Sequence, residues 1–455
     1  MVGTVGSVCP ECLGRVEAEL VEDGDVVRMV KRCPEHGGFS AVVWRGEPAF
    51  SSWVRPKIPF GGGPREAVGK GCPYDCGLCA RHAQRTCTAL VEITSRCNLG
   101  CPVCFADSGG PGTEPQREVL ARMFDQVMAR TGGCNLQLSG GEPTVREDLL
   151  RIVAMAKRAG FAFVQLNTNG LRLAEDPGLA EALASAGLSS VFLQFDGVRD
   201  AVYRALRGRD LLEVKGRAVD NAAAAGLGIV LVPTVARGVN TDQLWDIVLY
   251  GLARQPFIRG VHFQPMSYFG RYPADFIPDH VTLPELMTGL AQQSGGMVKV
   301  SDFLPPGCEH ALCSFSGKYM TREDGSFVRL GNVVCDCTPR PAEAGALKSI
   351  NVTARQWSAP ATPGPPSPPS PFQGPGADGP IPPTPQDNDL DRFLARARTH
   401  TFTISAMAFQ DAWSLNLDRL QGCCIHVAQP DGRLVPFCAF NLTSRHGRSL
   451  YRGRM

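Results

Sequence analysis

Three cysteines fall within eight residues in the segment 94–110, TSRCNLGCPVCFADSGG. Cys97, Cys101 and Cys104 are an odd set of metal ligands, because a tetrahedral structural site is completed by four. Three thiolates can instead bind three irons of a [4Fe–4S] cube and leave the fourth iron free for a substrate or cofactor; Pro102 favours the turn of the chain beside them. The spacing predicts an open cluster with these cysteines as catalytic ligands. The alternative is a zinc turn whose fourth ligand is distant in the sequence.

A second motif follows one predicted strand later. The strand 135–139 is followed by Gly140, Gly141, Glu142 and Pro143. Two glycines allow the backbone to approach a bound ligand closely, and exposed backbone groups or Glu142 could take the amino group of an amino-acid-like ligand. A lone GGEP would be an ordinary turn between a strand and a helix. Because it follows a three-cysteine loop, we expect these four residues to bind a cofactor.

The two motifs together resemble the radical S-adenosylmethionine (radical SAM) superfamily over residues 90–270. Its cluster motif CxxxCxxC appears as CNLGCPVC, and its GGE motif appears as SGGEP. The resemblance implies that S-adenosylmethionine chelates the open iron and that one electron from the cluster cleaves its sulfonium. The resulting 5′-deoxyadenosyl radical would remove hydrogen from an unactivated C–H bond. Many members carry an aromatic residue just before the third cysteine, near the adenine; this chain has Val103 there, and Phe105 after it is counted as a cofactor-binding candidate.

Polar residues at the ends of three later strands match positions that contact the cofactor in this superfamily. Singly, such residues are common turn formers. Their shared location at the carboxyl ends of parallel strands, where ligands bind in such folds, favours a functional interpretation. These cofactor-binding candidates are Asn167, Asn169, Gln194, Asp196 and Thr234.

The chain has 18 cysteines, and most of them fall in close groups. It begins without the features of a signal peptide, so a cytosolic location is expected, where disulfides are rare and such groups predict metal. Cys72, Cys76 and Cys79 repeat the CxxxCxxC spacing, and Cys87 adds a fourth thiol. Four ligands predict a closed auxiliary [4Fe–4S] cluster that transfers electrons or binds substrate, with zinc as the alternative. Without Cys87 a second open iron becomes possible.

The N-terminal sequences CPEC and CPEHG resemble a zinc ribbon or rubredoxin knuckle pair. Cys9, Cys12, Cys33 and His36 would form a tetrahedral site for one iron or zinc ion with a structural role. An unliganded His36 in a turn is the alternative.

A further auxiliary cluster is inferred for the C-terminal part of the chain. Adjacent cysteines cannot both easily face one cluster, so one of the pair Cys423 and Cys424 should pack elsewhere. Such a cluster would tie the last segment to the rest of the protein. The inferred ligands are Cys308, Cys313, Cys424 and Cys438, and the competing ligands are Cys335, Cys337 and Cys423.

Short apolar runs alternate with helical patterns from about residue 90 to residue 300. Several helical patterns stop at a glycine, which commonly follows a helix end. The alternation predicts an α/β fold with a parallel sheet, and about six units predict a partial (β/α)6 barrel. The strands are expected at 89–94, 135–139, 162–167, 191–196, 228–235 and 260–266.

Cysteine content and composition divide the chain further. The segment 358–386 is rich in proline and predicts an extended, mobile linker. The predicted domains are a cysteine-rich ribbon (1–70), an auxiliary-cluster segment (71–89), the partial barrel (90–300), an auxiliary-cluster region (301–357), the linker (358–386) and a C-terminal auxiliary-cluster segment (387–455).

Charge and hydropathy exclude some classes of partner. The chain has 46 lysines and arginines and 44 aspartates and glutamates, a balance that gives no reason to expect a nucleic-acid partner. No apolar run approaches the roughly 20 residues that span a bilayer.

The order of the motifs is similar, nearly from end to end, to the group that contains archaeal tetraether lipid synthases and 7,8-dihydro-6-hydroxymethylpterin methyltransferases. Together the cysteine groups predict three [4Fe–4S] clusters, two of them auxiliary, and one iron or zinc at the ribbon, with S-adenosylmethionine as the cofactor that the superfamily resemblance implies. The similarity to this group implies carbon–carbon bond formation, by methylation or chain coupling, on a pterin-like small molecule or a lipid. The expected partner is a low-potential electron donor such as ferredoxin or flavodoxin. The alternatives are a radical SAM peptide maturase with auxiliary clusters and a non-enzymatic zinc-ribbon binding protein.

Overall fold

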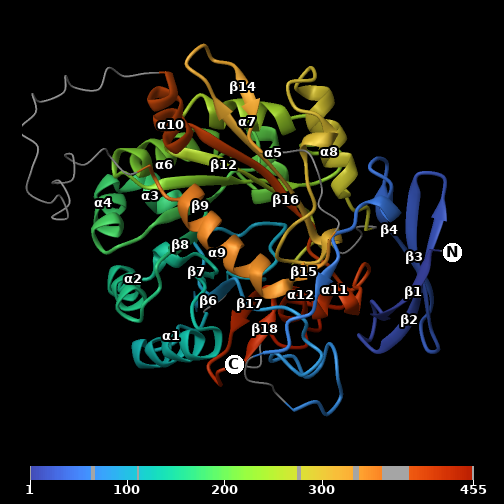
Figure 1. Ribbon diagram of the computed structural model, residues 1–455. Helices are drawn as coiled ribbons and strands as arrows, with labels where there is room; N and C mark the ends of the chain where they lie inside the picture. Colours follow the sequence, from blue (N-terminus) through green and yellow to red (C-terminus); the bar gives the residue numbers. More distant parts are fainter. Residues whose placement is uncertain are drawn as a thin grey trace, which may run out of the picture.

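The computed structural model describes residues 2–62, 67–109, 112–273, 278–331, 338–360 and 389–452, and its largest feature is one long mixed sheet (Figure 1). Six parallel strands form the middle of the sheet and lie side by side in chain order, as the alternating pattern predicts. They are β6 (Thr88–Thr94), β7 (Asn135–Gly140), β8 (Val164–Thr168), β9 (Ser190–Gln194), β10 (Gly228–Val232) and β12 (Ile258–Pro265).

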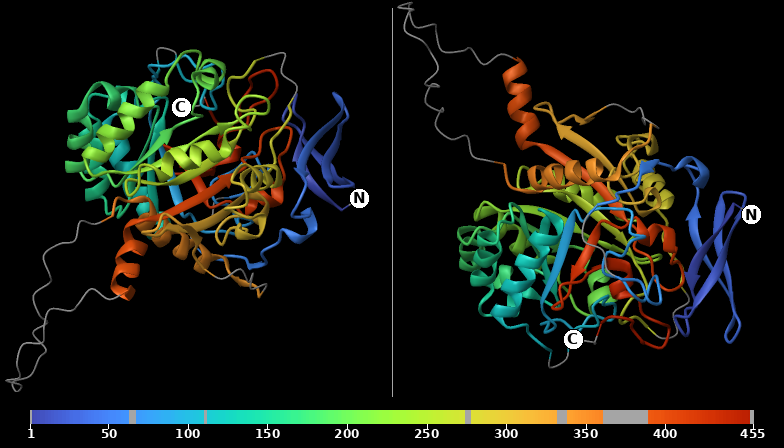
Figure 2. Two further views of the ribbon diagram at one scale, coloured as in Figure 1. Left: turned by 90° about the horizontal axis from the view of Figure 1, so that it is seen from above. Right: turned by 60° about the horizontal axis from the view of Figure 1, so that its bottom comes forward.

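Helices between these strands lie on the outer side of the sheet (Figures 1 and 2). In α2 (Leu149–Arg158), four buried apolar residues recur at helical spacing and form the stripe that packs inward. Gly132, just after α1, has φ +62° and ends that helix as predicted. No helix in the described ranges is long and apolar enough to cross a bilayer. The other helices here are α1 (Arg117–Thr131), α3 (Leu171–Glu175), α4 (Pro177–Ser185), α5 (Asp200–Arg207), α6 (Leu212–Ala224) and α7 (Leu244–Leu252).

The expected strand 228–235 is two strands, because Pro233 interrupts it. Proline has no backbone N–H to donate to a neighbouring strand. Beyond it, β11 (Thr234–Val235) pairs with the end of β12. This break turns Thr234 toward the carboxyl edge of the sheet, where the site lies.

Strands from the C-terminal third of the chain widen the sheet at both edges. Next to β12, β16 (Thr401–Met407) runs parallel, followed by the antiparallel strands β13 (Ser314–Thr321) and β14 (Phe327–Arg329). At the other edge β17 (Ile425–Ala428) runs parallel to β6 and is followed by β18 (Leu434–Pro436). Among the described residues the ladder runs from β14 to β18 without closing into a barrel. The two segments expected to hold auxiliary clusters therefore also build the sheet.

The N-terminal segment forms a separate four-stranded antiparallel sheet on one side of the molecule (Figures 1 and 2). Its buried Lys31 donates to Ala412 O at 2.7 Å and so joins it to the C-terminal segment. Arg45 and Glu285 form a 3.0 Å ion pair to α8 (Leu283–Gln293). The ribbon strands are β1 (Gly3–Val8), β2 (Arg15–Asp23), β3 (Val26–Cys33) and β4 (Gly37–Arg45). The remaining elements are β5 (Lys57–Ile58), β15 (Arg340–Pro341), α9 (Ala342–Trp357), α10 (Asp389–Thr399), α11 (Leu417–Gln421) and α12 (Phe437–Asn441).

A buried arginine on β12 connects the ends of α9 and α10. Arg259 is 2% exposed, and its Nε donates to Gln356 O at 2.9 Å. Its other nitrogens donate to Thr399 O and to Thr401 Oγ1. This guanidinium donates to carbonyl and hydroxyl oxygens, and burial lowers its pKa to about 10. The strand β16 and this arginine join the C-terminal segment to the rest of the protein.

We expect Arg259→Met to lower the free energy of unfolding by about 2–4 kcal/mol, because several buried carbonyls lose their donor. Urea denaturation would measure the change. Arg217→Met is the matched control, since Arg217 pairs with Glu213 on an exposed helix surface; its cost should stay within about 0.5 kcal/mol. Equal costs for the two variants would show that Arg259 does not hold these helix ends.

Candidate active site

The predicted catalytic cysteines lie on the loop that follows the carboxyl end of β6, and all three line one cavity. Arg271 holds this loop: its backbone exchanges two 2.9 Å hydrogen bonds with Cys104, and its Nε donates to Cys101 O at 3.0 Å. Burial raises the pKa of Cys97 to about 11 and also raises that of Cys101. Thiolates in this loop therefore need a bound cation to stabilise them, as an iron cluster would.

The two glycines of GGEP bring β7 against this loop. Gly140 has φ +130°, and a Cβ atom there would fall on Thr94 O. A Cβ atom on Gly141 would fall on Arg96 O, far inside van der Waals contact. The sequence predicted close approach to a ligand; the approach the structure shows is to the backbone of the cysteine loop. Both glycines still line the cavity.

The carboxylate of Glu142 is buried and joins the ends of β7 and β8. Its Oε1 accepts from Thr144 Oγ1 at 2.6 Å and from Thr168 Oγ1 at 2.7 Å. Its Oε2 accepts from Asn169 N at 2.6 Å. These bonds position the turn, and Glu142 also lines the cavity. Pro143 begins the short 3-10 helix Pro143–Val145 and is not among the cavity-lining residues.

The other predicted cofactor residues divide into two groups. Asn167, Asn169, Gln194, Thr234 and Phe105 line the cavity. Asn169 Nδ2 donates to Asn98 Oδ1 at 2.8 Å, which ties the end of β8 to the cysteine loop. Asn167 Oδ1 is buried without a partner among the described residues, as expected of a group aimed at a ligand.

Asp196, in contrast, is a positioning residue and does not line the cavity. It is fully buried and forms a two-bond ion pair with Arg207, at 2.7 and 2.8 Å. Arg207 also donates to Thr234 Oγ1 at 2.9 Å and to Val103 O at 3.2 Å, so it reaches from β11 to the cysteine loop. The expected direct contact of Asp196 with a cofactor is corrected to this indirect role.

Two cations at this edge were not predicted from the sequence. Arg207 belongs to the buried face of α5, four positions after Tyr203; a charged residue on an apolar stripe was the signal. Lys215 is fully buried, and its Nζ donates to Asn169 O at 2.5 Å. Burial lowers the pKa of Lys215 to about 8. Arg207 lines the cavity with the three cysteines, whereas Lys215 does not line it and instead bonds to the end of β8.

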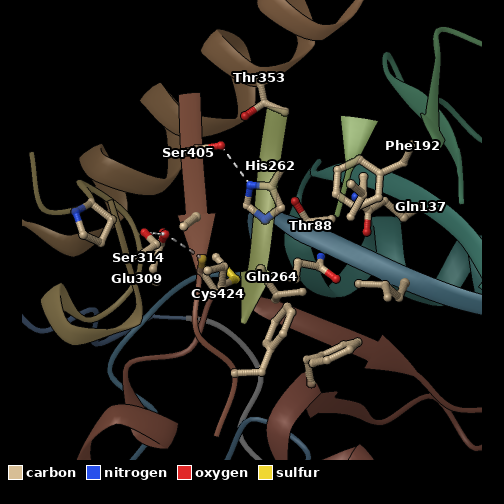
Figure 3. A pocket seen from close by; sticks show the side chains of 18 of the residues that line it. Thr88, Gln137, Phe192, His262, Gln264, Glu309, Ser314, Thr353, Ser405 and Cys424 are labelled. Carbon is tan, nitrogen blue, oxygen red and sulfur yellow. Dashed lines mark hydrogen bonds between the residues drawn. The ribbon is translucent and has the colours of Figure 1, made fainter. Parts of the chain in front are cut away.

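The cavity has a volume of about 700 Å³ and continues from the cysteine loop to helix α9. Figure 3 shows its inner wall, where His262 and Gln264 project from β12 beside Gln137 and Thr88. His262 Nδ1 lies 2.9 Å from Ser405 Oγ on β16, and burial lowers the pKa of His262 to about 4, so the imidazole is neutral near pH 7. Its ring centroid is 5.6 Å from that of Phe192. The polar residues Arg259, His262 and Gln264 within the buried strand β12 were a signal that sequence reasoning left unused.

A second group of cysteines lines the same cavity. The ligand atoms of Cys87, Cys308 and Cys424 lie within 4.8 Å of one another, and all three residues are buried. Glu309 Oε2 lies 3.8 Å from Cys424 Sγ (Figure 3), and burial raises the pKa of Glu309. The donor set of three thiols and a nearby carboxyl fits a metal centre.

The prediction that Cys87 completes the Cys72, Cys76 and Cys79 group is corrected. Cys87 directly precedes β6, and its backbone N donates to Cys424 O at 2.9 Å. Its side chain lies with those of Cys308 and Cys424. The other three remain together: contact with the thiol of Cys76 lowers the pKa of Cys72 to about 6, and Cys79 acts in the same direction. None of the three lines the cavity.

The predicted set Cys308, Cys313, Cys424 and Cys438 is also divided. Cys313, Cys423 and Cys438 line a small pocket, and Cys424 lines both this pocket and the cavity. Adjacent residues on an extended chain point to opposite sides. Of the adjacent pair, Cys424 groups with Cys87 and Cys308 and Cys423 does not, as expected of one member of the pair. Cys335 and Cys337 lie outside the described residues.

The N-terminal ligand set is brought together as predicted. The ligand atoms of Cys9, Cys12, Cys33 and His36 lie within 4.8 Å of one another. Backbone N–H groups of Glu11 and Gly14 point at the sulfurs of Cys9 and Cys12, at 3.4 and 3.3 Å. None of the four ligands lines the cavity, in agreement with a structural role.

Comparison with known proteins supports the descriptions of the cysteine-loop site and of the N-terminal ribbon. The model of the radical SAM superfamily matches residues 91–250, and that of the HMPTM N-terminal zinc ribbon domain matches residues 1–45. The 7,8-dihydro-6-hydroxymethylpterin dimethyltransferase of Methanocaldococcus jannaschii is 32% identical, over 96% of this chain and 93% of that protein. A probable GTP 3′,8-cyclase of Methanothermobacter thermautotrophicus is 34% identical, over 37% of this chain and 54% of that protein.

Solved structures give a weaker likeness. SuiB of Streptococcus suis superposes with a TM-score of 0.39 at 14% identity, over 46% of each chain. The hydrogenase maturase HydG of Carboxydothermus hydrogenoformans gives 0.36 at 14% identity, over 47% of this chain and 52% of that one. These scores are too low to indicate a function.

We expect Asp196→Asn to cost about 3–5 kcal/mol of stability, because it leaves the buried Arg207 charge without a counter-ion. Asp210→Asn is the matched control: Asp210 pairs with Arg204 at an exposed site, where a pair contributes about 0–1 kcal/mol. Chemical denaturation compares the two. A cost for Asp196→Asn no larger than that of Asp210→Asn would contradict the role assigned to the buried pair.

Proposed function

Because the chain belongs to the radical SAM superfamily and, within it, to the family of the 7,8-dihydro-6-hydroxymethylpterin dimethyltransferase, we propose that it methylates a carbon of a pterin-like small molecule. The chain is thus an enzyme, and the non-enzymatic ribbon module is ruled out. The observation that carries the choice of substrate is the polar wall of the cavity. Amide, hydroxyl and imidazole groups of Gln137, Gln264, Thr88 and His262 face the same space as the cysteine loop.

A lipid tail would remove these polar groups from water without offering them hydrogen bonds, at a cost of about 1–3 kcal/mol for each group. A pterin instead presents donors and acceptors around its edge, which two glutamine amides and a neutral histidine can match. Phe192, His262 and Trp357 provide ring surfaces beside them, with centroids 5.6 to 5.9 Å apart. A planar heterocycle fits this lining better than an alkyl chain does.

The cofactor end of the cavity is assigned to the first cysteine loop. Cys97, Cys101 and Cys104 would hold a [4Fe–4S] cluster, and Glu142, Asn167 and Gln194 would lie beside bound S-adenosylmethionine. When bound, this pair supplies a 5′-deoxyadenosyl radical that removes hydrogen from the substrate. The residues around it exclude water, and Arg207 fixes the loop by its bond to Val103 O.

The other cysteine groups are assigned by where they face. Cys87, Cys308 and Cys424 line the cavity, so a cluster there would meet the substrate end. Cys72, Cys76 and Cys79 do not line it, and Arg15 and Arg81 act on the pKa of Cys72. A cluster there suits electron entry from a low-potential donor such as ferredoxin or flavodoxin. The ribbon site would hold zinc or iron for stability.

We expect wild-type enzyme with a reductant, 7,8-dihydro-6-hydroxymethylpterin and excess S-adenosylmethionine, one molecule as the radical source and a second as the methyl donor, to give 5′-deoxyadenosine and a methylated pterin. Cys101→Ala should abolish both products, because the cluster loses a ligand. Cys87→Ala should keep cleavage of S-adenosylmethionine but lose the methylated pterin. Mass spectrometry of both products measures this. Normal 5′-deoxyadenosine from Cys101→Ala would refute the cofactor assignment, and methylation of a lipid but not of the pterin would refute the substrate.

Iron content tests the grouping of the cysteines. We expect Cys87→Ala and Cys308→Ala each to lose about four irons per chain after anaerobic reconstitution, and the double variant to lose no more. The double variant Cys87→Ala with Cys72→Ala should lose about eight, because those cysteines belong to different sites. The grouping of Cys87 with Cys308 would be wrong if their double variant lost about eight irons, or if the double variant of Cys87 and Cys72 lost only about four.

A further inference from the structure

The sheet beyond the superfamily strands presents a polar row to the cavity. Lys318 of β13 is opposite Thr403 of β16, and Ser316 is opposite Ser405, which in turn is opposite His262 of β12. Alternate residues of a strand share a face, so Ser316 and Lys318 point the same way. All five residues line the cavity. The ammonium group of Lys318 thus faces the same space as the His262 imidazole.

Lys318 is half-buried and has cations for neighbours. Burial lowers its pKa, and the charges of Lys348 and Arg355 on α9 lower it further. Lys348 and Arg355 are seven residues apart, on one face of that helix. Among the described residues, the ammonium of Lys318 has no hydrogen-bond or ion-pair partner. These like charges repel one another, an arrangement that a bound anion would relieve.

The acidic residues of the cavity are engaged elsewhere. Among the described lining residues the carboxylates are Glu142 and Glu309. Glu142 accepts hydrogen bonds at the ends of β7 and β8, and Glu309 accepts from Ser314 beside Cys424. The cationic lining residues are Arg55, Lys57, Arg207, Lys318, Arg340 and Lys348. Arg207 is neutralised by Asp196, but the other lining cations still outnumber the lining carboxylates, and this favours an anionic ligand in this space.

We propose that Lys318, with Lys348, binds the anionic group of the substrate, a phosphate or a carboxylate. Its Cα lies two strand spacings and two residues from that of His262, on the order of 12 Å, and the lysine side chain covers part of that distance. A bicyclic ring bound at His262 and Gln264, with a charged group on a short substituent, would span the distance from His262 to Lys318. The position of the ring rests on the proposed function; the anion site does not.

Equilibrium dialysis on the full-length, anaerobically reconstituted protein tests this. The probes are 7,8-dihydro-6-hydroxymethylpterin, its phosphate monoester, 7,8-dihydropterin-6-carboxylate and glycerol 1-phosphate. The variants are Lys318→Met, the conservative Lys318→Arg, Lys348→Met, and the control Lys299→Met, an exposed lysine that does not line the cavity. We expect an anionic pterin to bind at least about tenfold more tightly than the neutral one, as for one charge-assisted hydrogen bond.

Lys318→Met should remove that preference, Lys348→Met should weaken it, and Lys318→Arg and Lys299→Met should keep it. A preference for the phosphate ester or for the carboxylate identifies the group. Lys318-dependent binding of glycerol 1-phosphate without binding of any pterin would support the anion site, as the site of a lipid headgroup, and would overturn the pterin proposal instead. Equal affinity for neutral and anionic probes, or a preference unchanged in both Lys318→Met and Lys348→Met, would overturn the anion site.

Discussion

The contact between the backbones of β7 and the cysteine loop is the constraint on which the rest of the site depends. Thr94 O and Arg96 O occupy the space that a side chain on Gly140 or Gly141 would need. Only glycine permits the two chains to cross so closely, and Gly140 also needs its positive φ. The crossing sets where the loop leaves the sheet and thus where Cys97, Cys101 and Cys104 can bind a cluster. The carboxylate of Glu142 and the pair of Asp196 with Arg207 then hold the neighbouring strand ends against it.

The strands added at the edges of the sheet give the site its second half. The superfamily match ends at residue 250, before β12, whereas His262, Ser405 and Lys318 lie on β12 and the strands beside it. At the other edge β17 pairs with β6 and brings Cys424 to Cys87. One end of the cavity therefore lies within the superfamily match, and the other end is lined by segments that lie beyond it. This division explains why the substrate end carries the residues that would distinguish one substrate from another.

Local signals in the sequence predicted the parts that depend on neighbours along the chain. Six parallel strands, the glycine after α1 and the ligand set of the ribbon were all predicted, because period, turn chemistry and close cysteine spacing are local. The partners of Cys87 were not, because strand pairing between β6 and β17 joins residues more than 300 positions apart. Asp196 was assigned to the cofactor because nothing in its own strand reveals Arg207, which arrives from α5. The joining of the C-terminal segment by β16 and Arg259 was missed for the same reason.

An anomalous-diffraction map at the iron edge, from anaerobically grown crystals, tests the central claim most directly. The account predicts an iron–sulfur cluster at Cys97, Cys101 and Cys104 with one iron free of protein ligands, and a separate cluster at Cys87, Cys308 and Cys424. Zinc at the first site with a fourth protein ligand in place would contradict the account, because no position would remain for S-adenosylmethionine.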